Sequence, residues 1–253
     1  MSPLLLSLLS GAFIGGAGGY LGSLMLTRRM ALVAGPLGHL TLPGIALALL
    51  FGFDVSLGAF PFVVVGVVLI WLLEMRTKLP MEALTAVVFA SGVAITFLFL
   101  PIEQAETALV GDISKVGMGD TAFSVAASLA IMLAVKHAYP KLVLGNISEE
   151  LAAAEGIDLR RYNLLYLFLI AVIVALGVKM VGGLLTAALV AIPPAAARNV
   201  GKSLAQYALG AAAIGTLSAV IGIVLFEVTG FPAGPLIILV STAIFVVTLA
   251  FAK

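Results

Sequence analysis

Apolar runs long enough to cross a lipid bilayer occupy most of this chain, and no other feature limits its fold so strongly. A helix needs about 20 mostly apolar residues to cross the hydrocarbon layer. Hydrophobic residues make up 62% of the chain and charged residues only 10%, whereas a soluble domain carries about 25% charged residues. A core built from 253 residues cannot hide that much apolar surface from water. We therefore predict an all-α fold, a polytopic transmembrane helical bundle in which residues 1–253 form one integral membrane domain.

The predicted bundle contains about nine apolar segments. They lie at roughly 3–26, 30–52, 56–74, 83–101, 121–139, 162–180, 183–198, 204–227 and 234–252. The first is followed by Arg28–Arg29 and has no clear small-residue cleavage site, so we interpret it as a membrane span and not as a signal peptide. The seventh is short and ends in Pro193–Pro194, so a broken or re-entrant helix there, with eight full spans, stays open.

Lysine and arginine in the loops predict the orientation, because cytoplasmic loops carry an excess of both. With the N-terminus outside and the C-terminus in the cytoplasm, only Lys115 and Lys179 of the 13 such residues lie outside. The others lie inside: Arg28, Arg29, Arg76, Lys78, Lys136, Lys141, Arg160, Arg161, Arg198, Lys202 and Lys253. We therefore expect a multi-pass membrane protein with its N-terminus outside and its C-terminus in the cytoplasm. A net charge of +1 and the lack of a basic block argue against nucleic acid as a partner.

A histidine stands near the middle of the second segment, in the stretch GPLGHLTLPG at residues 35–44. His39 lies about 15 Å into a hydrocarbon layer of ~30 Å, counted from the arginines before it. Pro43 has no N–H, so the carbonyl of His39 loses its helical partner, and Pro36 and Gly44 favour further irregularity. An ionisable group and a released carbonyl at this depth are candidates for handling a cation. The alternative is a neutral histidine bonded to a neighbouring helix.

A metal site around His39 needs further ligands, because Zn²⁺ sites usually have at least three from the protein. The chain has no cysteine, and its other histidine, His137, lies beside Lys136 near the predicted cytoplasmic surface. No Asp or Glu falls within the apolar centre of a span. Six acidic residues map to the outer side, where they form either an attractive mouth for cations or a set of solvated charges: Asp54, Glu103, Glu106, Asp112, Asp120 and Glu227.

The loop at 140–161 is predicted to lie inside and to contain a short helix at about 147–156. Asn146 can cap this helix, with Glu149 at its third position, and Gly156 can end it in the left-handed conformation. Glu149 and Glu150 favour the positive end of the helix dipole. The helix is either a connector between two spans or a docking element for a partner.

Several segments, in the same order, resemble the permeases of zinc- and manganese-type metal ABC transporters, the ABC-3 type. Residues 28–59 begin "RRMALVAGPLGHLTLPG" and resemble that family's second span, an arginine-rich turn followed by Gly-Asp-x-x-Ser-His-x-x-x-Pro-Gly. Residues 147–161 resemble its coupling segment, 109–114 its outer loop, and 182–198 and 230–246 its late motifs. The resemblance therefore covers nearly the whole chain.

The resemblance implies a type II ABC-importer permease, which forms a homodimer in the lipid bilayer of the prokaryotic plasma (inner) membrane. Such a subunit receives a divalent metal ion (Zn, Mn or Fe) from an extracellular metal-binding protein, and a separate ABC ATP-binding subunit drives transport. It implies that the helix at 147–156 docks on the ATPase through Glu150, Ala153 and Gly156, and that His39 lies in the metal path. Because the chain has no phosphate loop, we expect a transporter subunit and not an enzyme, with no bound cofactor besides the transported metal.

The family's metal site is incomplete in this sequence. The family pairs its histidine with an aspartate four residues earlier, on the same helical face, where this chain has Gly35 followed by Pro36. Gly38 also replaces the serine before the histidine. Three explanations stay open. A carboxylate ligand comes from elsewhere, or backbone carbonyls and water bind the metal ion transiently without one. In the third, the transported substrate is not this family's usual metal ion.

Other functions stay open beside the metal importer. One is a permease-fold protein with altered or lost metal selectivity. Another is an ion-coupled secondary transporter, although such a protein needs buried acidic relays that the sequence does not offer. An intramembrane enzyme is disfavoured because neither His-Glu-x-x-His nor Gly-x-Ser-x-Gly occurs.

Overall fold

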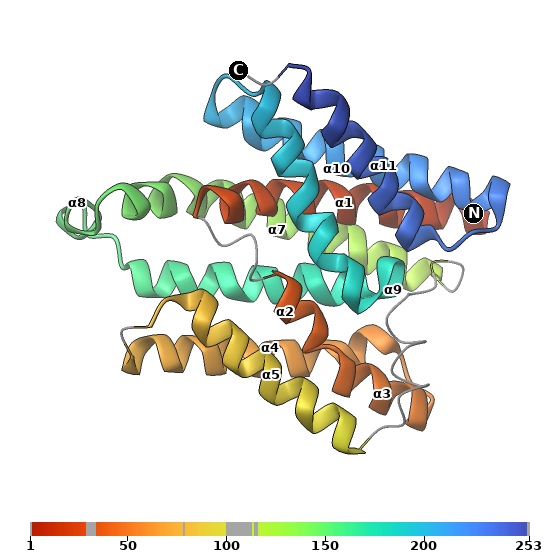
Figure 1. The fold of residues 1–253 in the computed structure, drawn as a ribbon, viewed down its shortest axis with the longest axis horizontal. Coiled ribbons are helices and arrows are strands. Elements are labelled where there is room, and N and C mark those ends of the chain that lie inside the picture. Colours follow the sequence, from red (N-terminus) through yellow and green to blue (C-terminus); the bar gives the residue numbers. More distant parts are fainter. Residues whose placement is uncertain (1, 29–33, 78, 100–112, 114–115, 252–253) are drawn as a thin grey trace.

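The computed structural model describes residues 2–28, 34–77, 79–99, 113 and 116–251 (Figure 1). All regular secondary structure within these ranges is helical, as predicted. The helices are α1 (Pro3–Thr27), α2 (Ala34–His39), α3 (Leu42–Phe51), α4 (Val55–Arg76), α5 (Met81–Phe99), α7 (Met118–Ile147), α8 (Glu149–Ala154), α9 (Leu159–Val200), α10 (Leu204–Thr229) and α11 (Ala233–Leu249).

Five helical stretches among the described residues are long and apolar enough to cross a membrane. They are Pro3–Thr27, Val55–Arg76, Met118–Ile147, Leu159–Val178 and Leu204–Thr229. The prediction of a transmembrane helical bundle is therefore confirmed, but the structure does not support a count of nine crossing segments. The predicted second segment is divided between α2 and α3, and the apolar helices at Glu82–Thr96 and Ala233–Leu249 have only 10–17 residues.

Helix α1 lies inside the bundle, against α7, α9 and α10 (Figure 1). A Cβ atom at Gly15 would lie 2.5 Å from the carbonyl oxygen of Gly215, and one at Gly19 would lie 2.2 Å from that of Ala211. Glycine at these positions lets the backbones of α1 and α10 touch, which is the usual way for helices to pack in lipid. The largest cluster of buried apolar side chains surrounds this contact.

Helix α9 changes direction at Gly182, whose φ of 78° and ψ of 166° are not helical. Glycine adopts this conformation readily because it has no Cβ. The two parts of α9 correspond to the predicted sixth and seventh segments, and the second part runs back across the bundle (Figure 1).

The second part of α9 does not end at its two prolines, as the sequence suggested, but continues through Pro193 and Pro194 to Val200. Because Pro194 has no N–H, the carbonyl of Val190 lacks its helical donor. The backbone of α1 covers this carbonyl at Gly22, where a Cβ would lie only 1.9 Å from the oxygen. Close contact with α1 therefore lets the helix continue past the prolines.

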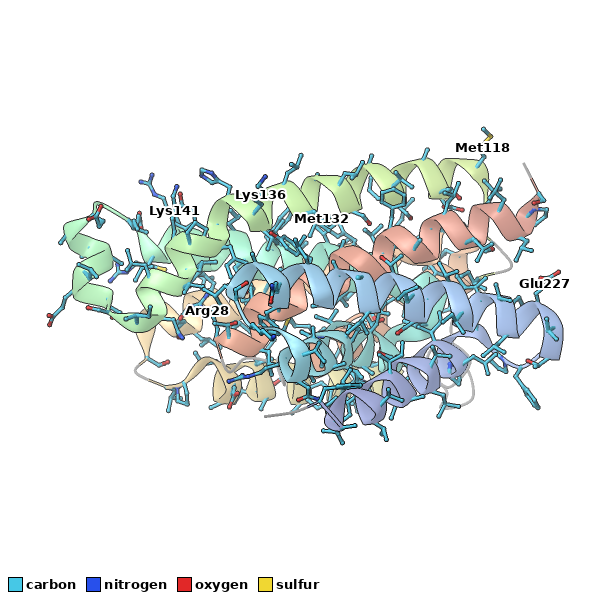
Figure 2. The ribbon with its side chains drawn as sticks, turned by 90° about the horizontal axis from the view of Figure 1, so that it is seen from above. Arg28, Met118, Met132, Lys136, Lys141 and Glu227 are labelled. Atoms are coloured by element: carbon cyan, nitrogen blue, oxygen red, sulfur yellow. The ribbon has the colours of Figure 1, made fainter. Side chains whose placement is uncertain are left out.

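The two ends of the bundle carry different groups (Figure 2). Arg28, Lys136 and Lys141 lie toward the end that carries α8, whereas Met118 and Glu227 lie at the opposite end. We call these the α8 end and the far end.

Candidate functional site

The segment around His39 is interrupted, as its prolines predict. Helix α2 ends at His39 and α3 begins at Leu42, with Pro43 in its first turn. Between them the hydroxyl of Thr41 donates to the carbonyl of Gly38 at 2.5 Å. This local bond closes a turn in place of a continuous helix.

Glycines in the neighbouring helices allow this interrupted segment to pack closely against them. A Cβ at Gly66 of α4 would lie 2.5 Å from Cδ1 of Leu40, and one at Gly92 of α5 would lie 2.6 Å from its Cδ2. A Cβ at Gly44 of α3 would lie 2.0 Å from the carbonyl oxygen of Gly58 in α4. The broken segment therefore packs tightly against α4 and α5 at Leu40, and against α4 again at Gly44.

The imidazole of His39 is half-buried beside α5. Its ring centroid lies 5.2 Å from that of Phe89, with the planes tilted by 51°. Within the ranges that the structure describes, no group of three or more His, Cys, Asp or Glu side chains could hold a metal ion. A metal-binding role for His39 thus stays a prediction, as do the roles of Pro36 and Gly44 in shaping a path.

The second histidine belongs to a different cluster. His137 is exposed on α7, and its Nε2 lies 3.0 Å from Nζ of Lys141. The same ammonium donates to the hydroxyl of Tyr162 at the start of α9. These contacts agree with an interfacial position near the α8 end.

Two of the predicted outer acidic residues line one cavity of about 560 Å³ at the far end. Asp54 caps α4, accepting from the N–H groups of Ser56 at 2.9 Å and Leu57 at 3.2 Å. Asp120 accepts from the N–H of Gly117 at 2.8 Å. Glu227 is exposed at the end of α10, while the predicted outer-loop motif at 109–114 and the acidic residues Glu103, Glu106 and Asp112 lie wholly or mostly outside the described residues.

The predicted loop helix is present as α8, but its cap is Ser148. The hydroxyl of Ser148 accepts from the N–H of Leu151 at 3.1 Å. The prediction that Asn146 caps this helix is wrong, because Asn146 belongs to the last turn of α7 and its Nδ2 donates to the carbonyl of Thr27 at 3.3 Å. A cap residue needs an extended backbone, and Ser148 has it, with φ −154° and ψ 119°.

The other features of α8 agree with the sequence. Gly156 is left-handed, with φ 71°, and its N–H donates to the carbonyl of Ala153 at 3.0 Å. Glu150 is exposed, as are two apolar side chains nearby, Ile147 at 74% and Leu151 at 49%. Ile147 and Leu151 therefore add apolar area to the exposed, acidic surface of α8.

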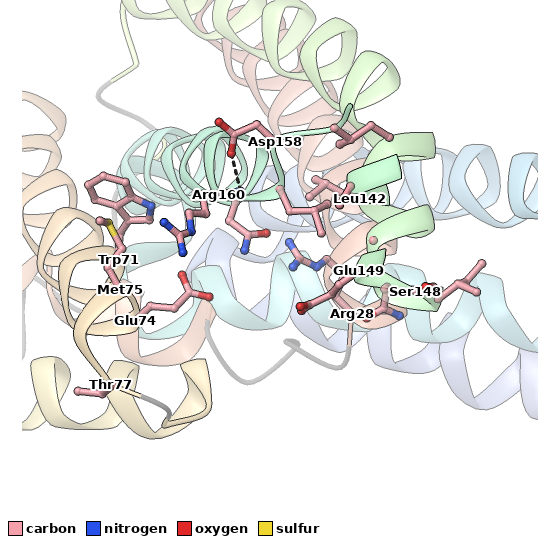
Figure 3. A pocket seen from close by; sticks show the side chains of 17 residues that line it. Arg28, Trp71, Glu74, Met75, Thr77, Leu142, Ser148, Glu149, Asp158 and Arg160 are labelled. Carbon is pink, nitrogen blue, oxygen red and sulfur yellow. Dashed lines mark hydrogen bonds between the residues drawn. The ribbon is translucent and has the colours of Figure 1, made fainter. Parts of the chain in front are cut away.

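A cavity of about 800 Å³ opens between α8 and the ends of α1, α4, α7 and α9 (Figure 3). Trp71, Glu74, Glu149, Ala153 and Asn163 are among its lining residues, together with Arg28. From the sequence alone, Arg28 is only a loop charge, and no motif marks Glu74. The available signal was a lone carboxylate two residues before the end of an apolar span.

The profile of the ABC 3 transport family matches residues 2–252, almost the entire chain. The chain belongs to the ABC 3 transport family. Curated ABC 3 relatives agree with this. The manganese import system permease protein ScaB of Streptococcus gordonii is 25% identical over 96% of this chain and 88% of its own length. The zinc transport system membrane protein TroC of Treponema pallidum is 29% identical over 94% of this chain and 85% of its own length.

A solved structure shares the fold of this ABC 3 chain. PsaBC from Streptococcus pneumoniae, in complex with a Fab, superposes with a TM-score of 0.83 at 23% identity, covering 98% of this chain and 91% of the other. This chain, with its broken segment at His39 and its helix α8, therefore has the fold of that solved structure over nearly its whole length.

Proposed function

We propose that this chain is the membrane-spanning permease subunit of an ATP-driven importer of divalent metal ions, with Zn²⁺, Mn²⁺ or Fe²⁺ as cargo. The observation that carries the proposal is the end-to-end similarity to relatives named as manganese and zinc permeases. The lack of a phosphate loop fits a subunit that relies on a separate ATPase.

His39 is our candidate for a metal contact along the path. It lies where the helix is interrupted, and its own carbonyl has no helical donor because Pro43 lacks an N–H. Pro36 and Gly44 are our candidates for shaping the path around it. Gly35 stands where the family has an aspartate. We therefore expect the cation to pass with His39, carbonyl oxygens and water as ligands, because weak binding favours release.

Three partners belong to this proposal. An ABC ATP-binding subunit docks on α8, with Glu150, Ala153 and Gly156 at the contact. An extracellular metal-binding protein delivers the cation at the far end, and a second copy of the chain completes a homodimer. The exposed apolar side chains around α8 support the first of these contacts.

Metal uptake into proteoliposomes that contain the permease, the ATPase and the binding protein tests the function. We expect ATP-dependent uptake of at least one of Zn²⁺, Mn²⁺ and Fe²⁺ by the wild type, and its loss in His39→Ala. His137→Ala is the matched control, because it removes the chain's other imidazole from an exposed position. Normal uptake by His39→Ala would exclude His39 from the path.

A second variant examines the missing carboxylate. If the wild type carries no metal and Gly35→Asp does, the chain has the permease fold with altered metal selectivity. If both carry metal, the carbonyl and water ligands suffice without an aspartate. If neither the wild type nor Gly35→Asp carries any of the three metals, the proposed function is contradicted.

A further inference from the structure

The cavity at the α8 end contains a partly buried cation, two of whose nitrogens have no hydrogen-bond acceptor. Arg28 directly follows α1 and lines the cavity. Its Nε and Nη1 atoms are buried and have no hydrogen-bond partner. The guanidinium lies over the ring of Tyr166, 5.3 Å from the ring centroid. A cation–π contact compensates only part of the lost hydration of a guanidinium.

The Arg28 guanidinium lacks hydrogen bonds that would offset the free-energy cost of burying its Nε and Nη1 atoms. A buried N–H group without an acceptor carries the full cost of its desolvation. Burial lowers the pKa of the Arg28 guanidinium, while Tyr166 and Glu74 act in the opposite direction. Arginine nevertheless keeps its charge in proteins. The open cavity therefore holds a charge that gains stability when a carboxylate comes within hydrogen-bond distance.

Two carboxylates face the same cavity from different elements (Figure 3). Glu74 projects from the end of α4, and Glu149 is the first residue of α8. Glu74 interacts electrostatically with both Arg28 and Glu149. The two carboxylates repel each other, so a cation between them is needed before their helices can approach.

The remaining charged residues of the cavity are differently placed. Asp158 caps α9 through the N–H groups of Arg160 and Arg161 and forms an ion pair with Arg161 at 2.9 Å. Arg160 also lines the cavity but is exposed to solvent. Arg28 is thus a partly buried cation that lines the same cavity as both carboxylates.

We propose that Arg28 is a positioning residue that joins α8 to α4: when the cavity closes during the transport cycle, its guanidinium bridges Glu74 and Glu149. This inference rests on the proposed function, because the ATPase that docks on α8 would drive the closure. The bridge transmits a movement of α8 to α4, and α4 packs directly on the broken segment at Gly44 and Leu40. Movement at the α8 end is thereby coupled to the surroundings of His39.

Closure is measured directly by cross-linking across the cavity. The chain has no cysteine, so Met75→Cys on α4 and Ile157→Cys just after α8 form a unique pair, and both positions line the cavity. In the complex with its ATPase, we expect ATP to increase the rate of cross-linking, and Arg28→Gln to remove this increase. Glu74→Gln and Glu149→Gln should act in the same way, which keeps the test decisive if Arg28→Gln fails to fold.

Transport is the second measurement. We expect metal uptake per ATP hydrolysed to fall roughly tenfold in Arg28→Gln, a change of about 1.4 kcal/mol. Exchanging the charges, Arg28→Glu with Glu74→Arg, should restore part of the uptake, whereas loss of a purely structural contact would not be rescued. Arg160→Gln is the matched control, since it removes an exposed cation from the same cavity, and Glu155→Gln removes an exposed carboxylate outside it.

Each result decides between the two proposals. A wild type that carries no metal but shows ATP-dependent, Arg28-dependent cross-linking contradicts the proposed cargo and supports the bridge. A wild type that carries metal while Arg28→Gln keeps normal cross-linking and uptake overturns the bridge. It is also overturned if Arg160→Gln, and not Arg28→Gln, abolishes closure.

Discussion

Individual carbonyl oxygens limit which side chains this bundle tolerates. At Gly44 the neighbouring oxygen belongs to Gly58, and a Cβ would lie 2.0 Å from it. Because that oxygen is part of the backbone of α4, it cannot move aside as a flexible side chain would. We therefore expect Gly44→Ala to push α3 away from α4 and to lower the free energy of unfolding by about 1–3 kcal/mol.

The thermal unfolding midpoint of the detergent-solubilised protein measures this effect. Gly119→Ala is the control, because no heavy atom lies within 4 Å of a Cβ built there. Equal midpoints for both variants would mean that the α3–α4 contact is looser than described. Transport should fall in Gly44→Ala as well, since the displaced helix carries the interruption next to His39.

At the scale of the element, α8 shows what sequence can and cannot predict. Composition places a helix at this position, and Gly156 is correctly predicted to be left-handed. The start is misjudged, because no local pattern reveals that α7 continues past Pro140 to Ile147. That continuation moves Asn146 into a helix and leaves Ser148 as the residue with extended backbone.

The cap assignment predicts a difference between two similar variants. Ser148→Ala removes the acceptor for the N–H of Leu151 and should destabilise α8 by about 1 kcal/mol, with amide exchange in its first turn accelerated roughly fivefold. Asn146→Ala should leave that exchange unchanged. Hydrogen exchange followed by mass spectrometry on a peptide covering 147–156 separates the two. Acceleration in Asn146→Ala alone would restore the capping scheme inferred from sequence.

At the scale of the whole molecule, the long apolar segments and the interruption at His39 follow from sequence, since length, hydropathy and proline act locally. Contacts between distant segments do not. Arg28, Glu74 and Glu149 come from three elements, and only the packing of α1, α4 and α8 around one cavity brings them together. The continuation of α9 through Pro194 likewise depends on Gly22, more than 150 residues earlier in the chain.

The distribution of basic residues along the bundle leads to a prediction of sidedness. Arg28, Lys136 and Lys141 lie toward the α8 end and Glu227 at the far end (Figure 2), and basic residues favour the cytoplasmic side. We therefore expect α8 to face the cytoplasm. In a chain without native cysteine, an impermeant maleimide should label Glu227→Cys in intact cells and Glu155→Cys only after the membrane is opened. Labelling in the reverse order would invert the orientation, and with it the side on which the ATPase reaches α8.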